Sequence, residues 1–289
     1  MHKLLGGINV LDIISETIID SLKILPFLFL TFLLMEYFEH KTKNKNDKII
    51  KKSGKLGPLF GAILGVIPQC GFSVAVTNLY ATRIVSLGTL ISVYLSTSDE
   101  MLPILISERA SIDLILKIIL IKVIVGMFFG FIIDLLIKRK EEATFHDFCN
   151  EKHCGCNHGI LKSSIKHTLD IFVFLIIISF LLNLGFSYLG EENLSKLFMK
   201  QNIFGTFLTS LIGLIPNCGA SVILTKLYLS SAISFPALIS GLLTGSGVAV
   251  LVLFKVNNNK KENFKILFTL YIIGVLVGIV FHLLNLLFY

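Results

Sequence analysis

The chain has 289 residues, of which 54% are hydrophobic and only 16% are charged, and its mean hydropathy is +0.82. A soluble domain cannot bury so large an apolar fraction, so the composition excludes an ordinary globular protein and predicts an all-α polytopic membrane protein. The formal net charge is +7, but the basic residues lie between apolar runs, where they act as topology signals. Nucleic acid is therefore not an expected partner. Five cysteines are too few for a disulfide scaffold.

The first predicted element is an apolar helix over about Val10–Phe38. Asp12, Glu16 and Asp20 lie in its first half, and no small-residue cleavage site follows. We therefore expect this segment to remain in the chain and not to be removed as a signal peptide. A loop with seven lysines, Glu39–Leu56, comes next.

The motif IPQCG interrupts the next apolar segment. Pro68 and Gly71 bracket Gln69 and Cys70, and proline and glycine at this spacing disfavour a continuous helix. Two half-length segments around the break fit a re-entrant hairpin with the motif at its tip, and three short crossings fit equally well. Ser73 and Thr77 follow on one helix face, where hydroxyls either line a pathway or join neighbouring helices.

A second break, Ser96–Glu100, falls within an otherwise apolar stretch. An ionisable residue at membrane depth is costly and indicates a functional site, so Asp99 and Glu100, with Ser98 beside them, are candidates to bind a cation or carry a proton. If the break lies near the membrane surface instead, these residues cap a short helix that begins at Met101.

An apolar helix over about Leu114–Ile137 leads into a polar loop that is rich in thiols and imidazoles. Its candidate metal ligands are His146, Cys149, His153, Cys154, Cys156 and His158. These side chains suit Zn, Cu(I) or another thiophilic ion, although their spacing is not that of a standard zinc finger. The basic run Lys138–Lys140 predicts a cytoplasmic loop.

The second half of the chain repeats the first at a constant offset of 148 residues. Its break reads IPNCG, and its candidate site residues are Pro216, Asn217, Cys218, Gly219, Ser221 and Thr225, with Ser246 in the counterpart of the second break. We divide the chain into a first membrane repeat (1–140), a cytoplasmic Cys/His-rich loop (141–163) and a second membrane repeat (164–289). The outer helices of this second repeat are expected over about Leu169–Leu189 and Phe264–Phe288.

The charges of equivalent loops predict that the two repeats are inverted. Glu39–Leu56 is strongly basic where Glu191–Asn202 is balanced, and Lys255–Lys265 is basic where Ser107–Lys117 is balanced. Equivalent loops should therefore lie on opposite sides of the membrane. Inverted repeats are common in secondary transporters, which hold the substrate near the midplane where the halves meet.

We expect the two IPxCG breaks to form the substrate site. Non-helical backbone at membrane depth persists only where protein or a water-filled cavity satisfies its polar groups, and half-helix ends offer N–H and C=O groups to a ligand. Cys70 and Cys218 add sulfur ligands, and Gln69 and Asn217 add amide oxygens. In the alternative interpretation, proline and glycine only permit tight packing and the cysteines are small apolar fillers.

The paired IPxCG motifs and the central loop ending CGCNHG resemble the heavy-metal exporter permeases related to the arsenical permease ArsP, whose members are described as arsenic efflux proteins or as manganese transporters. The resemblance covers nearly the whole chain and implies about ten membrane segments, with broken or re-entrant helices among them, and export of a toxic metal or metalloid. By motif match it assigns the site to Pro68, Cys70, Gly71, Pro216, Cys218 and Gly219. Trivalent arsenicals usually call for clustered thiols. Two meeting sulfurs suit a monomethylated As(III), whereas Asp99 and amide oxygens suit Mn(II).

The expected function is a secondary exporter of a metal or metalloid ion in the cytoplasmic (inner) membrane. The sequence has no phosphate-cradling GxxxxGK[ST] motif, so proton exchange through Asp99 or Glu100 is the expected coupling. A channel or uptake permease with the same architecture is the alternative. An enzyme is not expected, because no membrane histidine is close in sequence to Cys70 or Cys218. No cofactor is required: Zn, Mn or a thiophilic metal enters as substrate or loop ligand. The lipid bilayer and protons are the expected partners, and a homodimer is compatible with the sequence.

Overall fold

The computed structural model of the chain describes residues 56–67, 70–98, 101–137, 160–189 and 203–288, together with 14–15, 17–19, 21–22, 25–26, 29–30 and 32–33. Within these ranges the regular structure is helical, as the sequence predicts. The helices are α3 (Gly57–Gly65), α4 (Cys70–Ala81), α5 (Leu87–Ser96), α6 (Met101–Ser107), α7 (Ile112–Leu136), α9 (Ile160–Leu189), α11 (Phe204–Gly213), α12 (Cys218–Leu229), α13 (Phe235–Thr244), α14 (Ala249–Val256) and α15 (Lys260–Phe288).

The helix order recurs with the sequence offset. Four helices of the first half each begin 148 residues before a helix of the second half. The pairs of first residues are Cys70/Cys218, Leu87/Phe235, Met101/Ala249 and Ile112/Lys260. A non-glycine residue with positive φ follows each member of one pair: Arg83 (φ 61°) after α4 and Ser231 (φ 58°) after α12. The duplicated sequence therefore folds twice into the same series of helices and turns.

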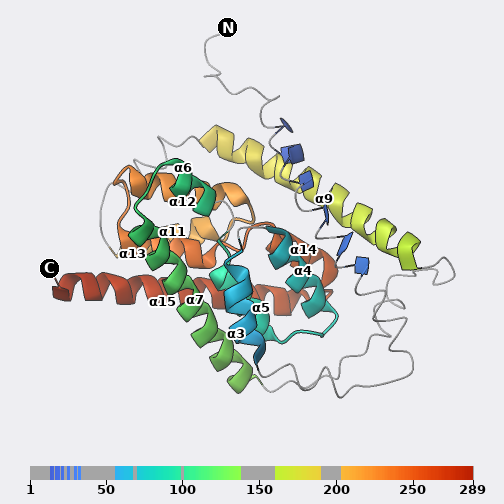
Figure 1. Cartoon of the computed structure of the whole chain (residues 1–289), viewed down its shortest axis with the longest axis horizontal. Coiled ribbons are helices and arrows are strands. Elements are labelled where there is room, and N and C mark those ends of the chain that lie inside the picture. The colour runs from blue at the N-terminus through green and yellow to red at the C-terminus, as the bar shows by residue number, and fades with distance from the viewer. Residues whose placement is uncertain are drawn as a thin grey trace, which may run out of the picture.

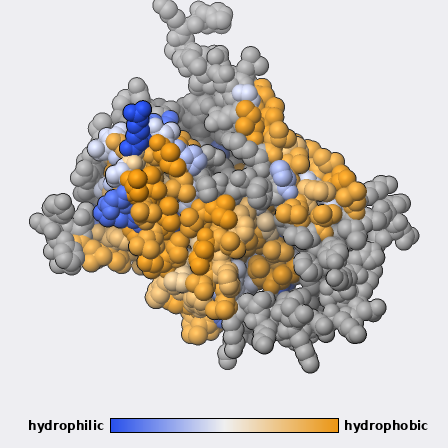
Figure 2. Space-filling view, viewed as in Figure 1, coloured by the Kyte–Doolittle hydropathy of each residue, from blue (hydrophilic) through white to orange (hydrophobic). Residues whose placement is uncertain are grey.

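Four described helical stretches are long and apolar enough to cross a membrane: Ile112–Leu136, Ser164–Leu181, Phe235–Val256 and Lys260–Leu284. The third stretch contains α13, a break and α14, and 83% of its most apolar window is buried, against 28% for α7. The broken span is thus central, and α7 lies at the periphery. The exposed apolar residues of α7 recur every third or fourth position from Ile112 to Leu135, as a lipid-facing stripe requires. Figure 2 shows apolar side chains over much of the visible described surface.

The interior contains many small and polar residues. Ser92, Ser96, Ser240 and Thr244 have no exposed surface. The Ser92 hydroxyl donates to the Pro58 carbonyl at 2.6 Å, and the Ser240 hydroxyl donates to the Thr206 carbonyl, its counterpart, at 3.0 Å. Hydroxyls thus join α5 to α3 and α13 to α11, as is usual where helices pack inside a membrane.

Glycines allow the last long helix of each half to pack closely: α7 against α3 and α5, and α15 against α11 and α13. A Cβ at Gly126 would lie 2.8 Å from the Ser92 carbonyl oxygen, and a Cβ at Gly274 would lie 2.9 Å from the Ser240 carbonyl oxygen. Only glycine allows backbones so close together. Helices α3, α5 and α7 therefore pack tightly together in the first half, and α11, α13 and α15 do so in the second.

The remaining short helices cross between the halves. Helix α4 of the first half packs on α14 of the second, and α12 of the second half packs on α6 of the first. Figure 1 shows α4 and α14 side by side. Near this contact, Arg83 forms a two-pronged ion pair with Glu262 at 2.7 and 3.0 Å, and the Tyr80 hydroxyl also donates to Glu262. The two membrane repeats are thus interlocked.

Helix α9 lies along one edge of the molecule (Figure 1). It begins at Ile160, which is four residues before the boundary that we expected at 164 and nine before the expected start at Leu169. Asp170 accordingly lies well inside this helix, where its carboxylate is 3.2 Å from the Lys255 ammonium of α14.

Candidate functional site

A small cavity of about 10 Å³ lies where the breaks of the two halves meet. This volume corresponds to about one water molecule. Residues of the break after α5, of α6 and α7, of the tip before α12 and of the break after α13 line the cavity. The described lining residues are Thr97, Ser98, Met101, Lys122, Asn217, Ser221, Leu242, Gly245 and Gly247.

Lys122 is the ionisable side chain among these described lining residues. It lies near the middle of α7, it is only 1% exposed, and its ammonium donates to the Leu242 carbonyl oxygen at 2.5 Å. Leu242 belongs to the last turn of α13, whose carbonyl end carries partial negative charge. The lysine thus sits against the carbonyl end of a half-length helix.

The tip of the second half reaches the cavity through Asn217 and Ser221. Asn217 is extended (φ −144°, ψ 144°) and caps α12, because its side-chain oxygen accepts from the Gly219 N–H at 3.2 Å. Ser221 follows one turn later, and its carbonyl accepts from the Thr225 hydroxyl at 2.7 Å. The IPNCG sequence therefore ends one helix, starts another and presents polar groups at the junction.

The first half contributes Thr97 and Ser98. Thr97 ends α5 with its N–H bonded to the Val93 carbonyl at 2.9 Å, and Ser98 donates its hydroxyl to the Ser96 carbonyl at 3.1 Å. Both residues are at most 5% exposed. On the opposite side of the cavity the backbone turns through Gly245 and Gly247, and Gly247 has a φ of 55°, which favours glycine. Two breaks that are equivalent in sequence thus face one cavity.

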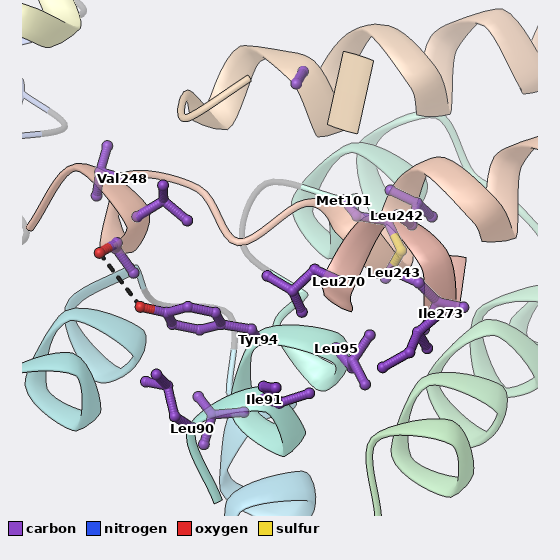
Figure 3. Packing of buried hydrophobic residues seen from close by; sticks show 14 of the residues in the cluster. Leu90, Ile91, Tyr94, Leu95, Met101, Leu242, Leu243, Val248, Leu270 and Ile273 are labelled. Atoms are coloured by element: carbon purple, nitrogen blue, oxygen red, sulfur yellow. Dashed lines mark hydrogen bonds between the residues drawn. The ribbon is translucent and has the colours of Figure 1, made fainter. Parts of the chain in front are cut away.

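Two positions equivalent to the cavity lining hold different side chains in the other half. Applying the 148-residue offset replaces Lys122 by Leu270 and Leu242 by Tyr94, both with no exposed surface. The Tyr94 hydroxyl lies 2.6 Å from the Thr77 hydroxyl and 3.4 Å from the Ala249 carbonyl. Figure 3 shows Tyr94 among buried apolar side chains. Thr77 also donates to the Ser73 carbonyl of its own helix at 2.7 Å. The Thr77–Tyr94 pair joins α4 to α5, and neither Ser73 nor Thr77 belongs to the described cavity lining.

Several predicted site residues can be placed. Ser98, Asn217 and Ser221 line the cavity, Ser246 is buried between two of its glycines, and Thr225 bonds to Ser221. Gly71 is buried, whereas Pro216 and Gly219 are partly buried at the second tip. Residues Pro68, Gln69, Asp99 and Glu100 lie outside the described residues, as do the side chains of Cys70 and Cys218 and all six ligand candidates of the central loop. Within the described part, no three His, Cys, Asp or Glu side chains are grouped to hold a metal ion.

Sequence reasoning missed Lys122, which lies inside the apolar run from Ile118 to Ile133. The rule that marks Asp99 as costly at membrane depth applies equally to this lysine. It could therefore have been found by scanning each long apolar helix for a single charge. The contact with Leu242, 120 residues away in the chain, has no such signal.

Comparison with known families gives one assignment. The model of the ArsP_2 family, described as a putative 10TM heavy-metal exporter, matches residues 9–189 and 172–286. No curated protein and no solved structure matches the chain. Because the family match extends over most of the sequence and the fold is an interlocked set of membrane helices, the chain belongs to the ArsP_2 family of heavy-metal exporters, as the resemblance indicates.

Proposed function

We propose that the protein is a secondary exporter that carries a metal or metalloid ion through the cavity between its two halves. The observation that carries this proposal is the cavity itself: it lies at the junction of two helix breaks, both halves line it, and Ser98, Asn217 and Ser221 bring polar groups to it. Secondary transporters hold their substrates at this kind of position. The family description of a heavy-metal exporter supplies the substrate class.

The exchange of helices between the halves supports the inverted arrangement of the repeats. The end of α4 meets the first turn of α15 through Arg83 and Glu262. Reciprocally, Tyr228 at the end of α12 lies within electrostatic reach of Lys117, near the start of α7. In both cases the end of the helix that follows a tip lies near the start of the last long helix of the opposite half, as is expected of repeats related by a two-fold axis. The halves would then rock about the cavity.

Two substrate chemistries remain for this site. Cys70 and Cys218 suit a thiophilic species such as a monomethylated As(III), whereas Asp99 and the amide oxygens of Gln69 and Asn217 suit Mn(II) or another divalent metal. We propose proton exchange through Asp99 or Glu100 as the coupling. The Cys/His loop would act as a cytoplasmic collector for Zn or a thiophilic ion, with the chain in the cytoplasmic membrane, alone or as a homodimer.

A growth-inhibition panel of metals and arsenicals in a sensitive host tests the function. We expect wild type to protect against at least one ion, and Ser98→Ala, Asn217→Ala, Cys70→Ser and Cys218→Ser to lose protection at unchanged membrane abundance. A variant without residues 146–158 should keep partial protection, since the loop only collects the ion. A protein whose expression protects against none of the ions would contradict the proposal.

Proteoliposomes separate the exporter from a channel. Accumulation of the protective ion against its gradient, driven by a pH difference and weakened by Asp99→Asn with Glu100→Gln, is expected of a proton-coupled exporter. Flux that only follows the gradient of the ion, with no response to the pH difference, would instead identify a channel or uptake permease.

A further inference from the structure

The ion pair between Arg83 and Glu262 joins the two halves at one end of their helices. Arg83 lies in the turn after α4, and Glu262 lies in the first turn of α15. Both guanidinium nitrogens donate to the carboxylate, at 2.7 and 3.0 Å. The Tyr80 hydroxyl donates to the same carboxylate, and the guanidinium carbon lies over the Tyr80 ring, 5.4 Å from its centroid. Because the start of α15 belongs to a basic segment, this contact is expected at the cytoplasmic face.

The repeated fold does not require these two charges. The 148-residue offset places Ser231 and Leu114 at the equivalent positions of the other half, and neither side chain is ionisable. Ser231 has nearly the same backbone conformation as Arg83, with φ values of 58° and 61°. The same turn therefore forms in the second half without an ion pair. The ion pair is thus specific to one of two equivalent junctions between the halves.

The position of the ion pair suits a contact that is made in one conformation and broken in another. When the halves of a transporter rock about a central site, contacts between the halves at one face separate while those at the other face close. The side chains of Arg83 and Glu262 are 32% and 21% exposed, so water can reach both charges as they part. Partly exposed pairs are weak enough to break, whereas a buried charge that loses its partner is costly.

From this arrangement we propose that Arg83 and Glu262 form a cytoplasmic gate, whose ion pair holds the cytoplasmic side of the cavity closed and breaks when that side opens. Tyr80 supports the gate, because its hydroxyl orients the carboxylate and its ring lies against the guanidinium. At the opposite face, Ser231 and Leu114 take the equivalent places, and no such pair between them has to be broken. This inference rests on the proposed transport function and adds which face is held closed, and by which residues.

The accessibility of the cavity from the two sides of the membrane tests the gate. Ser98 lines the cavity and is only 2% exposed, so Ser98→Cys in a full-length variant without the native cysteines reports whether a maleimide can enter. When Glu262→Gln is added, labelling from the cytoplasmic side, measured in inside-out vesicles, should rise by about fivefold. Labelling from outside intact cells should fall, because molecules that open to the cytoplasm are closed to the outside.

Three further variants show whether the contact itself is responsible. Exchanging the charges, by Arg83→Glu with Glu262→Arg, should bring the labelling back toward that of the parent. Tyr80→Phe removes one donor to the carboxylate and should change the labelling in the same direction as Glu262→Gln, but by less. Asp113→Asn is the matched control, since it breaks an exposed ion pair with Lys117 near the start of α7 and should leave the labelling unchanged.

Opposite changes on the two sides distinguish a gate from a structural role, because a loosened fold would raise labelling from both sides together. Unchanged cytoplasmic labelling in Glu262→Gln, or an equal rise on both sides, would overturn the inference. An exchange of charges that leaves the labelling raised would also overturn it. The measurement needs neither substrate nor transport. A wild type that protects against no ion of the growth panel would instead count against the proposed function.

Discussion

The ion pair between Arg83 and Glu262 joins residues 179 positions apart, and with the Tyr80 hydroxyl it ties the end of α4 to the start of α15. Both guanidinium nitrogens reach the carboxylate, and the side chains are 32% and 21% exposed. Two-pronged contacts of this kind are stronger than single ones. Glu262 therefore belongs to the contact between the halves, where we expect it to stabilise the fold.

Replacing Glu262 by Gln should lower the free energy of unfolding by about 1–2 kcal/mol, after allowance for partial exposure, because the guanidinium loses its charged partner. Thermal unfolding in detergent measures the change. Asp113→Asn is the matched control, since its contact with Lys117 is at the surface (2.6 Å, side chains 73% and 63% exposed) and should matter little. Equal effects of the two variants would show that the contact between the halves is not stabilising.

At the scale of helices, the small residues between α5 and α7 and between α13 and α15 set how closely the helices pack. Gly126→Ala and Gly274→Ala each place a methyl group within 3.0 Å of a backbone oxygen, so each should cost about 1–3 kcal/mol of stability. Gly205→Ala is the control, because its nearest neighbour is the Ala237 methyl at 3.9 Å. Melting temperatures of the three purified variants test this, and a loss at Gly205 as large as at Gly126 would refute the packing argument.

A carboxylate of α7 also fixes the start of α5. Asp134, two turns after Gly126 on α7, accepts from the Ser86 hydroxyl at 2.6 Å and from the Gly88 N–H at 2.8 Å. Asp134→Ala removes both acceptors at the helix N-terminus and should cost about 1–3 kcal/mol in thermal unfolding. Asp134→Asn keeps one acceptor oxygen and should cost less. If the two substitutions were equally harmful, the carboxylate would have another role.

For the whole molecule, the proposed inverted arrangement predicts which turns face which side of the membrane. The turn after α6 and the turn before α15 are equivalent in the two halves, so they should lie on opposite faces. Single cysteines at Ser107 and Lys261, both exposed, test this in a variant without the native cysteines. A membrane-impermeant maleimide should label intact cells at Ser107→Cys, and should label Lys261→Cys only after the membrane is opened. Labelling of both from one side would rule out inversion.

The sequence predicted features that depend on local chemistry. Proline and glycine in the IPxCG motifs end one helix and start another at Cys70 and Cys218, and α6 begins at Met101 as the Ser-Asp-Glu signal indicates. The cavity depends instead on contacts between distant segments. Lys122 meets Leu242 only because α7 and α13 come together, and Tyr94 fills the counterpart position only through its tertiary contact with Thr77. Periodicity and motif spacing carry no information about such pairs.

The unequal pair of Tyr94 and Leu242 has a consequence for the transport cycle. If both halves were alike, the conformations open to either side of the membrane would have equal energies in the absence of a gradient. A tyrosine held by the Thr77 hydroxyl at one position, and a leucine beside a small cavity at the other, should differ in the work needed to separate the helices there. In the absence of substrate, the protein should therefore favour one of the two conformations. Single-molecule distances measured across Tyr94 and across Leu242 should show one dominant population.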